Sequence, residues 1–194
     1  MLCATTWTGT TLRRATYFCL AFIPSTLVLA GGPYGSIEVW NWTGGAYTND
    51  ATGQFSHCAA HTQYQSGIGF VVGINVNGGW SLGFGHDSWR LNPGEKFPID
   101  LTFDSGSQFH VFGVVHSPNA VVVTMPLNSD LSNRFQMSQT MAAFAKGQLI
   151  QFDLTSTSQL LPALATCVAQ ALVGSPSAVN IRIPGSAAPP LRPR

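Results

Sequence analysis

The sequence contains few charged residues. They make up 9 % of the 194 residues, and the formal net charge is +1. Globular proteins usually carry about a quarter of charged residues, so uncharged polar side chains and glycine must supply much of this surface. That composition suits a secreted, strand-rich protein. The small net charge gives no indication of binding to nucleic acid or to an anionic membrane.

The sequence also lacks an apolar run of the length that a membrane-spanning helix needs. Ala15 to Leu29 is apolar, but it has about 15 residues and contains Pro24, whereas a spanning helix needs about 20. Two arginines precede this run, and Val28-Leu29-Ala30 resembles a cleavage site. We therefore expect a signal peptide at 1–30, cleaved after Ala30, with a retained membrane anchor as the alternative.

Alternation of apolar and polar residues is clearest at the sequence FPIDLTFD. Phe97, Ile99, Leu101 and Phe103 fall on one side of an extended chain, and polar residues or proline fall on the other. Side chains alternate across a β-strand, so this pattern predicts a strand with one buried face. Residues 80–85 repeat the pattern.

Turn residues divide the middle of the chain into hairpins. Asn77-Gly78-Gly79 separates Gly69–Val76 from Trp80–Gly85, and Asn-Gly is typical of tight hairpin turns. Ser117-Pro118-Asn119 separates two β-branched runs and predicts a second hairpin. Further strands are expected at Ser36–Trp42, turned by Gly44-Gly45, and at Gln54–Tyr64, Gln139–Ala145 and Gln148–Leu154.

Two segments have features of helices. Asn128 or Ser129 would cap a short helix over Asp130–Met137. Thr157 or Ser158 would cap a second helix that ends near Leu172. Apolar residues of this second helix share one face at helical spacing, namely Leu160, Leu164, Cys167, Val168 and Ala171.

These elements predict a mainly β protein with a single antiparallel sandwich or barrel-like domain. The domain would span residues 31–173, with about eight to ten strands and two helices packed on them. Residues 174–194 are rich in proline, serine and alanine and have little to bury, so we expect a disordered tail.

Two cysteines remain once the signal is removed. Cys3 and Cys19 would leave with it, so Cys58 and Cys167 stay in the mature chain. An exported protein folds in an oxidising compartment, which favours a disulfide between them, with two buried free thiols as the alternative. The bridge would attach the second helix to an early strand and close a loop of about 110 residues, worth about 4–5 kcal/mol of chain entropy.

No combination of residues forms a recognisable catalytic or metal site. His57 and Ser105 lie too close in sequence for a trypsin-like enzyme, and Asp104 lacks the preceding glycines of an oxyanion turn. His57 and His61 would lie about 13 Å apart on one strand, too far to share a metal directly. A hydrolase would need His57, His86 or His116 to meet Asp87 or Asp104 in space. We expect neither catalytic residues nor a metal or cofactor.

Four tryptophans are candidates for a binding surface. Trp40, Trp42, Trp80 and Trp89, together with Tyr47, have side chains that suit sugar or peptide recognition. The same side chains would also suit the core of the domain, and most of them are expected there at least in part.

Three stretches resemble one family of bacterial proteins. FSHCAAHTQYQSGIGFVVGINVNGGWSLGF, WRLNPGEKFPIDLTFD and LLPALATCV are similar to the invasion associated locus B family of secreted alphaproteobacterial proteins. The resemblance covers roughly Gly35–Leu172. It implies an export signal, a compact β-rich domain and a C-terminal helix that carries a cysteine. It also implies a non-enzymatic role, linked in some pathogens to host-cell entry.

We therefore expect a periplasmic or secreted protein that acts by binding an unknown protein or envelope ligand, without catalysis. A small-ligand carrier is the alternative, because a barrel of this strand count can enclose an apolar pocket. A hydrolase is the third hypothesis. The sequence does not indicate an oligomeric state. We expect no integral membrane segment after cleavage of the signal.

Overall fold

The computed structural model describes residues 31–184; the expected signal peptide and residues 185–194 lie outside this range. Eleven strands and two helices make up the described chain, together with one short 3-10 turn. The strands are β1 (Tyr34–Val39), β2 (Trp42–Thr48), β3 (Phe55–Gln63), β4 (Gly69–Asn75), β5 (Trp80–Gly85), β6 (Lys96–Phe103), β7 (Gln108–Ser117), β8 (Ala120–Thr124), β9 (Thr140–Ala145), β10 (Gln148–Asp153) and β11 (Asn180–Ile183). The helical elements are α1 (Ser129–Met137), α2 (Thr157–Val173) and the turn η1 (Pro176–Ala178).

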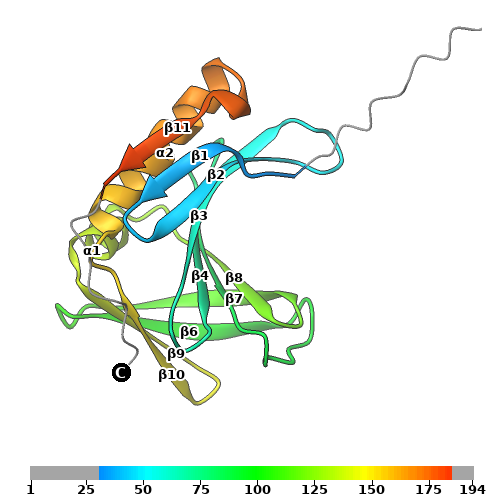
Figure 1. The fold of residues 1–194 in the computed structure, drawn as a ribbon. Helices are drawn as coiled ribbons and strands as arrows, with labels where there is room; N and C mark the ends of the chain where they lie inside the picture. Colours follow the sequence, from blue (N-terminus) through cyan, green and yellow to red (C-terminus); the bar gives the residue numbers. More distant parts are fainter. Residues whose placement is uncertain (1–30, 185–194) are drawn as a thin grey trace, which may run out of the picture.

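All strands belong to one sheet, in the order β10-β9-β6-β7-β8-β5-β4-β3-β2-β1-β11. Neighbours are antiparallel except β1 and β11, which run parallel. The sheet curves strongly, so that β6, β9 and β10 lie below the region of β1, β2 and β11 in Figure 1. Because β10 and β11 stand at opposite ends of the strand order, the sheet is not closed into a barrel. The expected mainly β domain is confirmed.

The predicted hairpins in the middle of the chain are confirmed. β4 pairs with β5 through Val72 and Leu82, and β7 pairs with β8 through Val115 and Val121. The side chain of Asn75 stabilises the first turn, because its Oδ1 accepts hydrogen bonds from the backbone amides of Asn77 and Gly79. The alternating residues of β6 also behave as predicted, with Ile99, Leu101 and Phe103 buried.

The first predicted strand is wrong, because the chain turns inside it. Residues 36–42 were expected to be one strand, but Trp40 has a φ of 56° and begins a turn between β1 and β2. Val39 and Trp42 face each other across this hairpin, and both are buried. Gly44 and Gly45 were expected to form the turn, yet they lie inside β2. The backbone of β3 approaches Gly44 closely, and the backbone of Tyr34 approaches Gly45.

Both predicted helices are present, with one correction to their caps. Asn128 caps α1, and its Oδ1 accepts hydrogen bonds from the amides of Asp130 at 2.9 Å and Leu131 at 3.2 Å. Residue Ser156 occupies the N-cap position of α2, so the expected cap at Thr157 or Ser158 is wrong. The Thr157 hydroxyl is instead fully buried, 2.7 Å from the carbonyl oxygen of Phe135. It thereby connects the start of α2 to α1.

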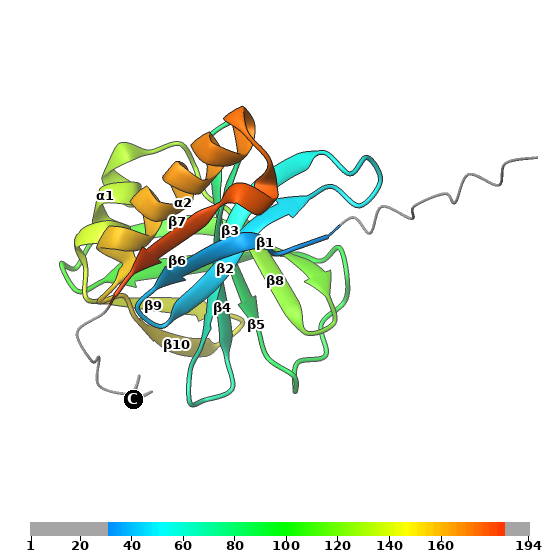
Figure 2. The same cartoon turned by 45° about the horizontal axis from the view of Figure 1, so that its top comes forward.

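The predicted disulfide joins Cys58 in β3 to Cys167 in α2, with their Cα atoms 6.2 Å apart. Both cysteines are completely buried. Helix α2 packs against β1 to β4, and α1 packs against α2; Figure 2 shows the two helices side by side. The bridge therefore fixes the last helix to the sheet that it covers.

The chain does not become an unstructured tail at residue 174. After α2 it forms η1 and then β11, which pairs with β1 from Ser36 opposite Asn180 to Val39 opposite Ile183. Val179 is 1 % exposed and belongs to the core. The expectation of disorder is therefore wrong for residues 174–184. None of the helices in the described range is long and apolar enough to cross a membrane.

Candidate functional site

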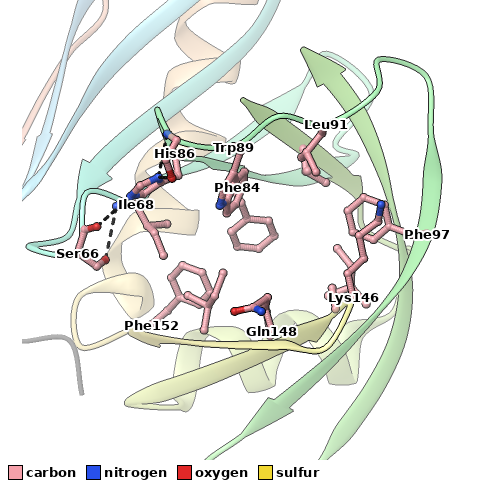
Figure 3. Close-up of a pocket in the computed structure, with 16 residues that line it drawn as sticks. Ser66, Ile68, Phe84, His86, Trp89, Leu91, Phe97, Lys146, Gln148 and Phe152 are labelled. Carbon is pink, nitrogen blue, oxygen red and sulfur yellow. Dashed lines mark hydrogen bonds between the residues drawn. The ribbon is translucent and has the colours of Figure 1, made fainter. Parts of the chain in front are cut away.

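The best candidate for a binding site is a cavity of about 360 Å³ inside the curved part of the sheet. Its size lies near the lower end of the range of about 300–1,000 Å³ found for small-molecule sites. It is lined by the last part of β5 and β9, the first part of β6 and β8, the inward face of β10, and the segments before β4 and after β5 (Figure 3). The lining residues are Ser66, Ile68, Phe84, His86, Ser88, Trp89, Leu91, Phe97, Ile99, Val121, Ala143, Ala145, Lys146, Gln148, Ile150 and Phe152.

Side chains alternate across each strand, and the inward-facing ones form the apolar walls of the cavity. Phe84 of β5, Ile99 of β6 and Phe152 of β10 all occupy the inward side of their strands and are buried. On β9 the inward positions nearest the mouth hold Ala143 and Ala145. Their short side chains leave space where larger apolar residues would fill the core.

Aromatic rings form one end of the cavity. The rings of Phe84 and Phe152 lie 5.1 Å apart between centroids. Phe70 packs on both of them, 5.2 Å from Phe84 and 4.8 Å from Phe152. Because these rings support one another from behind, the wall is a continuous part of the core and its shape is largely pre-formed.

A histidine with a defined hydrogen-bonding pattern stands at the mouth. The backbone amide of Ser88 donates to His86 Nδ1 at 3.1 Å, so Nδ1 must be an acceptor. The Ser88 hydroxyl lies 2.7 Å from the same nitrogen. The proton of the neutral ring is therefore on Nε2, which donates to the Ser66 carbonyl oxygen at 3.1 Å. Figure 3 shows these bonds joining two segments of the mouth.

A lysine on the β9–β10 turn borders the other side of the mouth. Lys146 has a φ of 49°, which places it in the left-handed region. Its Nζ forms an ion pair with Glu95 and lies 5.0 Å from the centre of the Phe97 ring. These contacts hold the lysine stem along the cavity wall while the ammonium is occupied by a carboxylate.

The edge strand β10 and the segment between β3 and β4 both line the cavity and meet at a seam without strand pairing. Ser66 and Ile68 stand on one side of this seam, and Gln148 and Ile150 of β10 stand on the other. A side chain crosses this seam: the Tyr64 hydroxyl donates a hydrogen bond to the Asp153 carbonyl oxygen at 2.8 Å. Burial, and secondarily the charge of Asp153, raises the pKa of Tyr64 well above its usual value.

The structure does not bring the four candidate tryptophans onto one surface. Trp42 and Trp80 are 1 % and 6 % exposed and belong to the core, so they provide no binding surface. Trp40 is half-buried and donates to Gln159 Oε1 on α2 at 3.1 Å. Trp89 alone of the four lines the cavity. Trp40 begins the turn between β1 and β2, whereas Trp42 is the first residue of β2.

The histidines considered for a hydrolase border one shared hollow. His57, His86, His116 and Asp87 border a second hollow of about 620 Å³ on the outer face of β3, β4, β5 and β8. In the part of the chain that the structure describes, no hydrogen bond links these histidines to Asp87 or Asp104. Nor do the described residues contain a group of three or more side chains suited to a metal ion.

Two of these residues have other roles. The imidazole of His57 stacks on the ring of Tyr47, with centroids 5.1 Å apart, and burial lowers its pKa. Asp104 Oδ2 accepts a hydrogen bond from the Gln139 amide at 2.7 Å, at the start of β9. That bond lowers the pKa of Asp104. Both residues thus stabilise local structure.

The cavity was not identified from the sequence as a set of residues. Its walls come from segments between residues 66 and 152, and no local motif joins them. One signal was present: β9 reads TMAAFA, with alanines at two consecutive inward positions. Small residues on the inward face of a predicted barrel strand indicate unfilled space.

Comparison with known proteins gives a likeness of fold. No protein-family profile matches the chain, and no curated protein matches it significantly. Among solved structures, the crystal structure of invasion associated protein B from Bartonella henselae matches with a TM-score of 0.50. The match has 13 % sequence identity and covers 70 % of this chain and 99 % of the other.

The chain is similar to that protein in its fold. This confirms the resemblance to the invasion associated locus B family that the sequence indicated, at the level of the fold. At this identity the likeness transfers no activity, partner or site residue.

Proposed function

We propose that this chain is an exported, non-enzymatic binding protein and that the cavity is its ligand site. The observation that carries the proposal is the apolar cavity of about 360 Å³, which is walled by supported aromatic rings and bordered by a few polar groups. Sites of this kind are typical of small-molecule binding. This gives the carrier hypothesis a structural basis that the broader hypothesis of protein interaction does not yet have.

Export is the second part of the proposal. A buried disulfide between Cys58 and Cys167 is typical of proteins that fold in an oxidising compartment. Together with the sequence pattern of residues 1–30, it supports a periplasmic or secreted location. Intact-mass measurement of the protein from its natural host tests this: the expected chain begins at Gly31 and contains no free thiol. A full-length chain with reduced cysteines would contradict export.

Binding can be tested with N-phenyl-1-naphthylamine, an uncharged molecule that fluoresces in apolar surroundings. We expect saturable binding at one site per chain. Ala145→Leu should weaken it at least tenfold, because the added side chain occupies the mouth of the cavity. Ala142→Leu is the matched control, since Ala142 is on the opposite face of β9 and does not line the cavity.

A second readout does not depend on a variant. In methyl NMR spectra of the unmodified protein, the probe should shift the signals of Ala143 and Ile150, which line the cavity. The signals of Val173, which is 91 % exposed on α2, should stay in place. Absence of saturable binding, or shifts confined to residues away from the cavity, would refute the proposed site.

A further inference from the structure

We infer that the ligand of this cavity is an uncharged, compact, ring-bearing molecule with one neutral hydrogen-bonding group, which pairs with the side-chain amide of Gln148. The inference rests on the proposed function, because it describes the occupant of the same cavity. Three features of the lining support it: its charged side chain is already paired, most of its polar groups already have partners, and the Gln148 amide lies at the border of the cavity.

The lining offers no unpaired charge to a ligand. Lys146 is the charged side chain among the lining residues of the described chain, and Glu95 already neutralises it. The Phe97 ring holds the same ammonium from the other side, at 5.0 Å. A charged ligand group would lose its hydration in this apolar cavity without gaining a partner, which is strongly unfavourable.

Most polar groups at the mouth already have partners within the protein. Both ring nitrogens of His86 are engaged, one by the Ser88 amide and the other by the Ser66 carbonyl oxygen. The Ser88 hydroxyl donates to His86 Nδ1. A ligand that required these groups would have to break existing hydrogen bonds, and the net gain would be small.

Gln148 is different, because none of the hydrogen bonds in the described chain uses its side-chain amide. It lies at the first position of β10, on the same face as Ile150 and Phe152. Figure 3 shows the amide at the border of the open space, beside the aromatic end of the cavity. An amide can both donate and accept, so it suits a hydroxyl, a carbonyl or a neutral N–H.

The walls favour a ring over a long flexible chain. Phe84, Phe97, Trp89 and Phe152 supply aromatic surfaces, which stack on flat rings with favourable geometry. The cavity is also near the lower size limit of ligand sites, so a compact molecule fills it. With Gln148 at the mouth, the polar group of the ligand would face outwards and the ring would be buried.

The test compares three molecules with the same ring system: naphthalene, 1-naphthol and naphthalene-1-sulfonate. Each would be used to displace N-phenyl-1-naphthylamine from the intact protein. We expect naphthalene to displace the probe, 1-naphthol to bind about three- to tenfold more tightly through one hydrogen bond, and the sulfonate to bind at least tenfold more weakly than naphthalene.

Gln148→Leu should remove the advantage of 1-naphthol over naphthalene. Gln151→Leu is the matched control, because Gln151 is on the same strand but faces away from the cavity. It should bind all three molecules as the wild type does.

The outcomes separate this inference from the proposed function. Tight binding of the sulfonate, or an unchanged preference for 1-naphthol in Gln148→Leu, would overturn the inference while leaving the cavity as a binding site. If neither the probe nor any naphthalene binds, the proposed function itself fails and the inference falls with it.

Discussion

The indole nitrogen of Trp42 donates a 2.8 Å hydrogen bond to the hydroxyl of Ser156, across 114 residues of sequence. Both side chains are buried, so this bond joins the start of β2 to the N-cap of α2 inside the core. It satisfies the single polar atom of a large aromatic side chain. It also explains why Ser156 makes no side-chain cap bond to its own helix.

Ser156→Ala should lower the free energy of unfolding by about 1–3 kcal/mol, because the buried indole N–H would lose its partner. Urea unfolding measures the loss. Gln159→Ala is the matched control: it removes the acceptor of the Trp40 indole in an exposed hydrogen bond, where water can replace that acceptor. Its effect should stay within about 0.5 kcal/mol. Equal losses in both variants would show that burial of the indole bond is unimportant.

Gly44→Ala should destabilise the protein by about 3 kcal/mol, since the new methyl group would lie 2.0 Å from the Ala59 carbonyl oxygen. Gly73→Ala provides the comparison in the same sheet. There the nearest atoms to a new methyl group lie 3.5 Å away, which is ordinary contact. That variant should stay within about 1 kcal/mol of the wild type. Thermal and urea unfolding of both variants would reveal any reversal of this order.

Replacing both disulfide cysteines, as Cys58→Ala with Cys167→Ala, should cost about 2–5 kcal/mol in the free energy of unfolding. The bridge closes a separation of 109 residues, which restricts the unfolded chain strongly. Either single substitution should cost nearly as much as the double one, because one change already removes the bond. Additive losses from the two single variants would contradict a formed disulfide.

Stability should depend on pH in two separate windows. The pKa of Asp104 is lowered from 3.8 by the Gln139 amide, so the unfolded state binds more protons just below that value. Stability should therefore fall as the pH falls through this window. The pKa of His57 is lowered from 6.5 by burial, so stability should also fall as the pH drops below 6.5.

A different substitution tests each of these two pH ranges. Asp104→Asn should reduce the fall in unfolding free energy below pH 3.8 and leave the fall below pH 6.5 unchanged. His57→Gln should have the reverse effect. Unfolding free energies measured between pH 3 and pH 8 would test this. A variant that changes both windows equally would indicate a general loss of stability instead of a titrating group.

Local patterns accounted for the central strands but not for the ends of the domain. The alternation in β6 and the turn residues of the β4–β5 and β7–β8 hairpins are properties of a few adjacent residues. The NIRI segment of β11 also alternates polar and apolar residues, but it has only four residues and lies in a stretch rich in proline and serine. Its structure depends on β1 and on burial of Val179, so composition alone suggested a tail.

The first hairpin and the cavity were missed for related reasons. Trp40 adopts a left-handed conformation that is unusual for an aromatic residue, and Asn41 is the single turn-favouring residue beside it. The cavity depends on how far the sheet curves before β10 meets the Tyr64 segment. That curvature is a property of the whole sheet, whereas sequence periodicity describes one strand at a time.

The parallel pairing of β1 with β11 also determines when the molecule can finish folding. Glu38 and Arg182 of these strands form an ion pair across 144 residues of sequence. A contact of such long range forms slowly, because the chain must first close a very large loop. During synthesis the outer edge of β1 stays unpaired until residues 180–183 have been made. Until then β1 has an unpaired outer edge, and such an edge can pair with another chain.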